Sequence, residues 1–159
     1  MAKVKPIPDG YRSVTPYLFV RGAARAIEFY KNAFGAIERA RMPGPDGKIG
    51  HAELQIGDSM IMLADENPQN QAKSPETLGG AASSLVLYVE NVDSIVDKAV
   101  NAGAKIVRPV ADQFYGDRMG SIVDPFGQIW SVGTHIEDVS PEEMKKRMTK
   151  MASQAAGQG

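Results

Sequence analysis

A histidine and a glutamate two residues apart are the first candidates for chemistry in this chain. His51 and Glu53 lie in an alternating stretch, residues 50–63, so a β-strand there would place both side chains on one face. A carboxylate beside an imidazole can orient it as a general base, and the same two side chains can bind a divalent metal ion. The pair can also recognise a ligand without chemistry, or simply complete a polar cavity wall with a hydrogen bond. These roles stay open at this point.

The same alternation assigns further residues to the face that carries His51 and Glu53. Aromatic and thioether side chains dominate it, which suits a flat or apolar small molecule, although a filled core would have the same composition. The expected ligand-binding residues of this face are Tyr17, Phe19, Gln55, Met60, Met62, Tyr88 and Ser131. The opposite face is apolar and should pack against helices; it carries Leu18, Val20, Ala52, Leu54, Ile56, Ile61, Leu63, Leu85, Leu87, Val89, Trp130 and Val132.

A loop and three arginines complete the candidate site. Tyr115 and Arg118 precede the last hairpin and can form a lid over a ligand, or the loop is packed by its own aromatic residues. Arg39, Arg41 and Arg118 can supply charge to an anionic ligand, whereas arginines on edge strands are more often solvated.

These residues are positioned by a pattern that occurs twice. Residues 119–132 read as a β-hairpin around the turn Asp124-Pro125-Phe126-Gly127, in which proline sets φ and glycine accepts a positive φ. Residues 50–63 repeat that pattern, and a strand, a helical apolar stripe and a Gly-Ala pair recur at separations of 68 or 69 residues. The sequence therefore predicts an α+β fold of two tandem βαβββ modules.

The remaining segments fit around these modules. Ser140-Pro141-Glu142-Glu143 is a capping box with proline at the first helical position, and we expect the helix it starts to cover a sheet edge or a partner subunit. The expected organisation is a lead-in (1–13), a first module (14–64), a linker or mobile loop (65–82), a second module (83–136), a C-terminal helix (137–153) and a disordered tail (154–159).

Composition excludes several classes of protein. The chain has 159 residues, no cysteine and a net charge of −1, which argues against disulfide scaffolds, thiolate chemistry and nucleic-acid binding. Its apolar runs are too short to span a membrane, and its first residues lack the apolar core of a signal peptide. We expect a cytoplasmic protein.

Several segments together resemble a known superfamily. They are TPYLFV, AIEFYKNAFGA, GHAELQIGDSMIMLADE, QFYGDRMGSIVDPFGQIWSV and THIEDVSPEEM. The chain resembles the vicinal oxygen chelate (VOC) superfamily of glyoxalase I, extradiol dioxygenases and bleomycin and fosfomycin resistance proteins, and within it the PhnB-like branch. The resemblance implies a glyoxalase/bleomycin resistance fold of paired βαβββ modules around a cavity, usually in a homodimer.

The metal site that the resemblance implies is degenerate. Members similar to glyoxalase I place four metal ligands at positions that correspond here to Thr15, Glu53, Ser84 and Ser131, and only Glu53 is a strong ligand. We therefore expect no cofactor, with a divalent metal as the less favoured alternative.

Fold and residues together favour a homodimeric, metal-independent small-molecule-binding protein of the glyoxalase and bleomycin resistance type. The alternative is an enzyme, either a lyase, isomerase or dioxygenase with a relocated His51/Glu53 metal centre or a metal-free acid-base catalyst. A third alternative, an interaction module, depends on the methionine stripe of the last helix.

Overall fold

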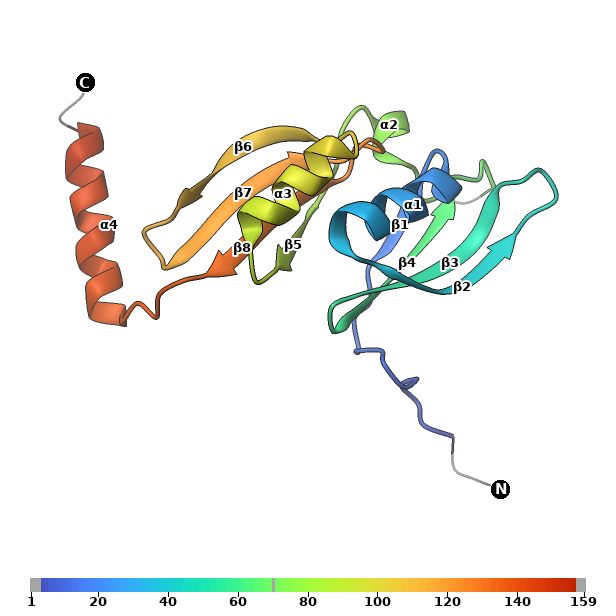
Figure 1. Ribbon diagram of the computed structural model, residues 1–159, viewed down its shortest axis with the longest axis horizontal. Coiled ribbons are helices and arrows are strands. Elements are labelled where there is room, and N and C mark those ends of the chain that lie inside the picture. Colours follow the sequence, from blue (N-terminus) through green and yellow to red (C-terminus); the bar gives the residue numbers. More distant parts are fainter. Residues whose placement is uncertain (1–3, 70, 157–159) are drawn as a thin grey trace.

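The fold consists of two βαβββ modules and an appended helix (Figure 1). The computed structural model describes residues 4–69 and 71–156. The first module contains β1 (Tyr17–Val20), α1 (Ala23–Phe34), β2 (Ile37–Pro43), β3 (Ile49–Ile56) and β4 (Ser59–Asp65). The second contains β5 (Ser84–Tyr88), α3 (Val92–Asn101), β6 (Lys105–Asp112), β7 (Asp117–Val123) and β8 (Ile129–His135). The predicted tandem α+β fold is confirmed.

Each module forms its own four-stranded sheet. The strand orders are β1-β4-β3-β2 and β5-β8-β7-β6, with β1 and β5 parallel to their neighbours and every other pair antiparallel. In the described residues no strand of one sheet pairs with a strand of the other. The first strand of each module therefore lies at a sheet edge with one side of its backbone unpaired.

Short sequence signals set the limits of the helices. Gly35 ends α1 in the left-handed region at φ 66°, as expected for a glycine C-cap. The side chain of Asn91 accepts a hydrogen bond from the Ser94 backbone N–H at 2.9 Å and caps α3. The Ser140 side chain likewise accepts a hydrogen bond from the Glu143 backbone N–H at 3.2 Å, which is the serine half of the predicted capping box, while the Glu143 carboxylate accepts from Arg147.

The segment that links the modules is more structured than a mobile loop. It contains the short helix α2 (Pro75–Leu78), capped by Ser74. The Glu66 carboxylate accepts hydrogen bonds from the hydroxyls of Ser74 at 2.6 Å and Thr77 at 2.7 Å. These bonds tie α2 to the end of β4.

The two modules join through their helices around one buried carboxylate. Helices α1 and α3 pack against each other, and both modules contribute to a single apolar core. Within it, the hydroxyl of Tyr30 on α1 donates to Asp124 Oδ2 at 2.7 Å, and Trp130 Nε1 donates to the same oxygen at 3.0 Å. Asp124 Oδ1 accepts the backbone N–H groups of Phe126 and Gln128, so the predicted turn also supplies two donors. Burial raises the pKa of Asp124 although these donors favour its charged form.

The last helix, α4 (Pro141–Ala156), projects from the end of the second module (Figure 1). Arg147 anchors it, donating to both carboxylate oxygens of Glu137 at 2.7 and 2.9 Å and to the Phe114 carbonyl at 3.0 Å. The side chains of Met148 and Met151 are exposed, so α4 does not cover a sheet edge of its own chain as one alternative expected. Residues 154–156 are helical rather than part of a tail, and 157–159 lie outside the described residues.

We predict that Tyr30→Phe lowers the free energy of unfolding by about 1.5–3 kcal/mol, because a buried carboxylate loses one of its donors. Urea denaturation followed by circular dichroism measures this. Tyr115→Phe is the control, since its hydroxyl donates only to the weak sulfur acceptor of Met119, at 3.3 Å. Equal effects of the two substitutions would contradict the assigned role of Tyr30.

Candidate functional site

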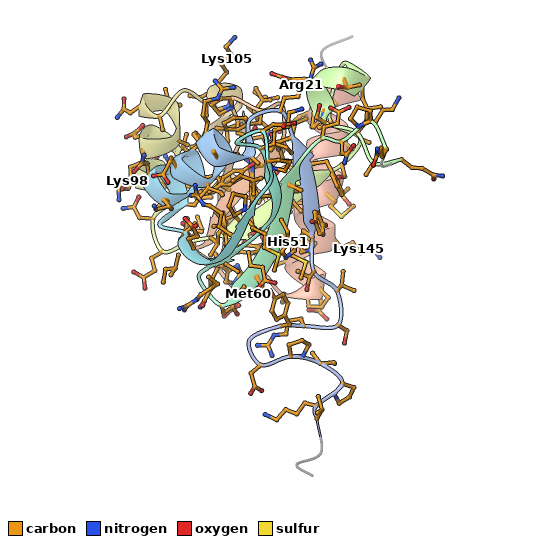
Figure 2. All side chains as sticks on the ribbon, turned by 90° about the vertical axis from the view of Figure 1, so that its right-hand side faces the viewer. Arg21, His51, Met60, Lys98, Lys105 and Lys145 are labelled. Atoms are coloured by element: carbon orange, nitrogen blue, oxygen red, sulfur yellow. The ribbon has the colours of Figure 1, made fainter. Side chains whose placement is uncertain are left out.

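Three predicted site residues meet on the sheet face of the first module that is turned away from the helices. The Tyr17 hydroxyl lies 2.8 Å from His51 Nδ1, and His51 Nε2 lies 3.2 Å from Glu53 Oε1. The Tyr17 ring also stacks on Phe19, with 4.8 Å between ring centroids. His51 is labelled in Figure 2, where it lies on the sheet of the first module. We call this surface the first open face.

Strand register brings Tyr17 to His51 from two strands away. Phe19 on β1 pairs with Ala64 on β4, and the antiparallel pairing of Ala52 with Leu63 places His51 beside Ala64. The small Ala64 side chain leaves space above it, so the phenol of Tyr17 crosses β4 and reaches the imidazole. Sequence alternation predicted the shared face, but not this contact between residues 34 positions apart.

Tyr11, a residue that sequence reasoning missed, adds to this cluster. Its hydroxyl is buried beside Glu53, although it makes no well-formed hydrogen bond within the described residues. Burial and the neighbouring carboxylate raise the pKa of Tyr11 to about 12. Proximity to Tyr11 and then to His51 lowers the pKa of Glu53, which favours the charged carboxylate at neutral pH. The lead-in is thus part of the site.

Arg39 extends the same face toward Gln55. Its Nε and Nη2 lie 3.0 and 2.6 Å from Gln55 Oε1. A bulge between Glu38 and Ala40 leaves Arg39 without a ladder partner on β3 and redirects its side chain. Arg41, in contrast, is paired with Glu38 and Glu28, and Glu28 belongs to α1. Of these two arginines, Arg39 is the one directed to the candidate site.

The second module carries a different polar cluster. The Tyr88 hydroxyl donates to Asp117 Oδ2 at 2.7 Å, and His135 Nδ1 lies 2.7 Å from Asp117 Oδ1. His135 Nε2 faces Asp138 Oδ1 at 3.0 Å. Hydrogen bonds from Tyr88 and His135 lower the pKa of the buried Asp117, while the two carboxylates raise the pKa of His135. Two acceptors around one imidazole favour its doubly protonated form.

A cleft of about 1310 Å³ lies between the modules. One wall is the segment before β1 and the β3–β4 turn, with Thr15 and Met60, and the other includes β5 with Val86 and Tyr88. His135 is among its lining residues, whereas Tyr17, His51 and Glu53 are not. The structure thus divides the expected cavity into the first open face and this cleft.

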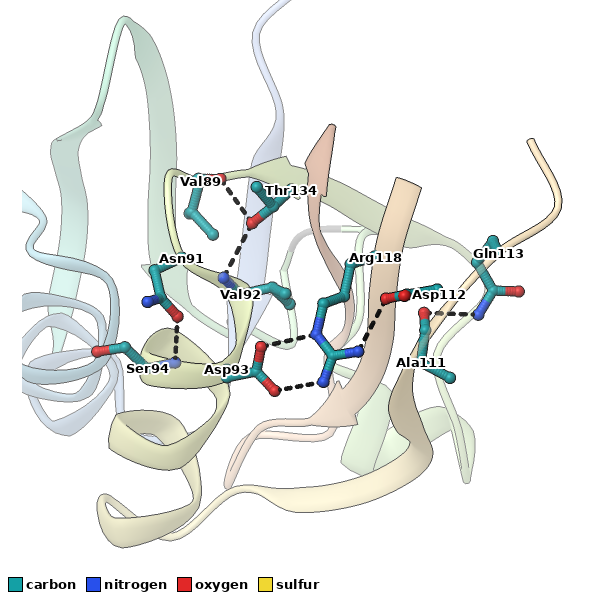
Figure 3. Close-up of polar contacts among 10 residues, drawn as sticks. All are labelled: Val89, Asn91, Val92, Asp93, Ser94, Ala111, Asp112, Gln113, Arg118 and Thr134. Atoms are coloured by element: carbon teal, nitrogen blue, oxygen red, sulfur yellow. Dashed lines mark hydrogen bonds and ion pairs between the residues drawn. The ribbon is translucent and has the colours of Figure 1, made fainter. Parts of the chain in front are cut away.

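Arg118 lies away from both the first open face and the cleft. Its guanidinium donates to both oxygens of Asp93 at 2.8 Å and to Asp112 at 2.8 Å (Figure 3). Asp93 belongs to α3, so this arginine binds the helix of its own module. Tyr115 packs edge-on against Phe114, as in the alternative of a loop packed by its own aromatics.

Two further predicted residues, Met62 and Gln55, lie in the first sheet. Met62 on β4 pairs with Glu53 on β3, and Gln55 on β3 pairs with Met60 on β4.

The chemistry of the implied metal site does not fit a divalent ion. Ser131 lies with its hydroxyl 3.2 Å from that of Ser121, and Ser84 is exposed at the sheet edge. Neutral hydroxyls are weak ligands, which leaves Glu53 as the one strong donor of the four positions. Residues 4–69 and 71–156 contain no group of three or more His, Cys, Asp or Glu side chains arranged to hold a metal ion.

No helix in the described part of the chain is long and apolar enough to cross a membrane.

The fold and the open sheet faces define a protein of paired βαβββ modules. A model of the Glyoxalase/Bleomycin resistance protein/Dioxygenase superfamily matches residues 12–132, and the chain belongs to this family. The recognition made from the sequence is confirmed.

Relatives support this assignment. An uncharacterised protein of Mycobacterium bovis, Mb0911c, is 42% identical over 140 residues, which cover 86% of this chain and 92% of the relative. The crystal structure of the At5g48480 gene product of Arabidopsis thaliana superposes with a TM-score of 0.64 at 27% identity, covering 77% of this chain and 98% of that one. A PhnB protein from Bacillus cereus, at 19% identity and a TM-score of 0.62 over 77% of this chain and 99% of its own, shares the fold.

We predict that Tyr11→Phe raises the pKa of Glu53 toward its ordinary value of about 4.3, as measured by carboxyl NMR titration. The pKa of Glu53 is lower in the folded state than in the unfolded state. The stability that its charged carboxylate contributes is therefore present at neutral pH and is lost as pH falls through the folded pKa. The destabilisation by Tyr11→Phe should therefore be largest near pH 7 and vanish at low pH. Tyr88→Phe is the control, because Tyr88 bonds to Asp117 instead; an unchanged Glu53 pKa in Tyr11→Phe would refute the assignment.

Proposed function

We propose that this chain is a metal-independent, glyoxalase/bleomycin resistance-like protein that binds a small molecule, and that a second copy completes its cavity. The observation that carries the proposal is the cleft between the first module and the unpaired edge strand β5, along which Val86 and Tyr88 are exposed. Ligand and partner would then share the same side of the molecule.

The lining of the cleft suits a flat, largely apolar compound with one polar group. Met60, Ile61 and Val86 supply apolar surface, while Tyr88 and His135 supply polar atoms. Ligand pockets usually enclose about 300–1,000 Å³. A cleft of about 1310 Å³ exceeds that range, which supports a second component that narrows it.

A second copy is the component that fits. Both β1 and β5 are edge strands, and such strands are usually protected by pairing or covering. Val86 and Tyr88 on β5 are 58% and 60% exposed, and Tyr17 on β1 is 40% exposed. A symmetric pair of chains would bury these side chains and leave a smaller cavity beside them. Many proteins of this family are dimers.

The alternative of a metal-dependent enzyme has weaker support. Both ring nitrogens of His51 have hydrogen-bond partners, Tyr17 and Glu53, so a metal ion there would displace one of them. A metal-free acid-base role needs no such rearrangement.

We predict that the protein sediments as a dimer at micromolar concentration and that Val86→Asp shifts it toward monomer by at least tenfold in dissociation constant. A carboxylate at a buried edge-strand position would lack a partner. Val107→Asp is the matched control, because Val107 is also 58% exposed but lies on β6, the opposite edge of the same sheet. Equal shifts in both variants, or a wild-type monomer, would exclude the proposed interface.

We also predict that the fluorescent aromatic sulfonate 8-anilinonaphthalene-1-sulfonate binds the native protein. Tyr88→Ala should weaken this binding about five- to tenfold, or roughly 1–1.4 kcal/mol, since an aromatic contact is lost. Tyr115→Ala should leave it unchanged because Tyr115 lies outside the cleft. Fluorescence titration at matched dimer content measures both, and a Tyr88→Ala affinity equal to that of the wild type would place the site elsewhere.

A further inference from the structure

Tyr17, His51 and Glu53 are linked in the order of a proton relay. The phenol oxygen lies 2.8 Å from one ring nitrogen of His51, and the other ring nitrogen lies 3.2 Å from the Glu53 carboxylate. A hydroxyl, an imidazole and a carboxylate in this order form the arrangement in which a base activates a hydroxyl and an acid orients the base. We propose that Tyr17 is a catalytic residue of a metal-free proton-transfer site on the first open face. The proposal goes beyond small-molecule binding at the cleft, because Tyr17, His51 and Glu53 are not among the residues that line it.

Hydrogen-bond direction assigns the role of each group. A charged carboxylate only accepts, so His51 Nε2 carries the hydrogen that faces Glu53. In the neutral imidazole, Nδ1 is then the acceptor, and the Tyr17 O–H donates to it. The hydrogen of Tyr17 is thereby committed to His51, and a lone pair of its oxygen remains for a ligand. Tyr17 is 40% exposed, so a small molecule can approach this oxygen.

This geometry suits a neutral carbonyl compound with a C–H next to the carbonyl. The Tyr17 oxygen takes the substrate proton while the Tyr17 proton passes to His51 Nδ1, giving an enolate and an imidazolium held by Glu53. The reverse transfer returns a proton to the same or another carbon, so the step balances without a further reactant. The charged Glu53 disfavours an anionic substrate close by, and the stacked rings of Tyr17 and Phe19 offer a flat apolar surface. The Arg39 guanidinium places positive charge on the same face.

Tyr88 provides an internal comparison. It is more exposed than Tyr17, at 60%, and its hydroxyl also makes one short hydrogen bond. Its acceptor is Asp117, a carboxylate whose lowered pKa makes it a weak base. Tyr88 should therefore lack the activation that His51 gives to Tyr17.

The first experiment follows hydrogen-deuterium exchange of phenylacetone in D₂O near neutral pD by NMR, after dialysis against EDTA. We expect the wild type to accelerate exchange at the carbons next to the carbonyl, and Tyr17→Phe and His51→Phe each to lower this acceleration at least tenfold. Tyr115→Phe should retain it, because Tyr115 lies outside the cleft and packs against Phe114. Exchange no faster with the wild type than with Tyr17→Phe would overturn the proposal.

The second experiment reads activation of the hydroxyl directly, with benzenesulfonyl fluoride and peptide mapping by mass spectrometry. A bond forms between the Tyr17 oxygen and sulfur, fluoride leaves, and the phenol proton passes to His51. We expect Tyr17 to be labelled at least tenfold faster than Tyr88, and His51→Phe to remove this difference. In that variant the rate should rise only as the phenol ionises in strongly alkaline solution, because burial raises the pKa of Tyr17 above its ordinary value. Equal labelling of the two tyrosines in the wild type would refute activation by His51.

Binding and proton transfer are separated by the anilinonaphthalene titration. Retained dye binding without exchange or selective labelling would overturn the relay and leave the proposed function intact. Failure of the dye to bind the wild-type protein would count against the proposed function itself. A Tyr17→Phe variant that keeps its melting temperature while losing exchange identifies a chemical rather than a structural role.

Discussion

The buried carboxylate of Asp124 is the interaction on which the arrangement of the two modules depends. A charge taken out of water is costly unless donors surround it, and Asp124 has four: two backbone N–H groups of its own turn, Trp130 and Tyr30. The first three come from the same hairpin, whereas Tyr30 comes from the helix of the other module. Satisfying Asp124 therefore places α1 against the second module, and the apolar core forms around that contact.

Joining the modules through their helices determines which surfaces remain for function. The apolar side of each sheet is used by the shared core, so the opposite side and the first strand of each module stay accessible. The same side thus presents unpaired backbone at β1 and β5, apolar side chains and the candidate polar clusters. In the proposed function one surface would serve both ligand binding and self-association, which would link the two.

The two modules have the same topology but different chemistry on their accessible faces. In the first, a tyrosine faces an imidazole, and in the second a tyrosine faces a carboxylate. The carboxylate, Asp117, is a weak base because the hydrogen bonds from Tyr88 and His135 lower its pKa. The repeated scaffold is intact although three of the four implied metal positions carry only neutral hydroxyls, and each half has its own polar network.

The sequence by itself determined the features that depend on a few neighbouring residues. The repeat, the Gly35, Asn91 and Ser140 caps and the Asp124–Gly127 turn all follow from local backbone preferences, and strand alternation separates helix-facing from open positions. Only the tertiary structure decided that Arg118 binds Asp93, that Tyr11 adjoins Glu53, and that the expected cavity is divided. Tyr17 and His51 are 34 positions apart, and Tyr30 and Asp124 are 94 apart. Contacts at such separations depend on strand register and module docking, which no local pattern encodes.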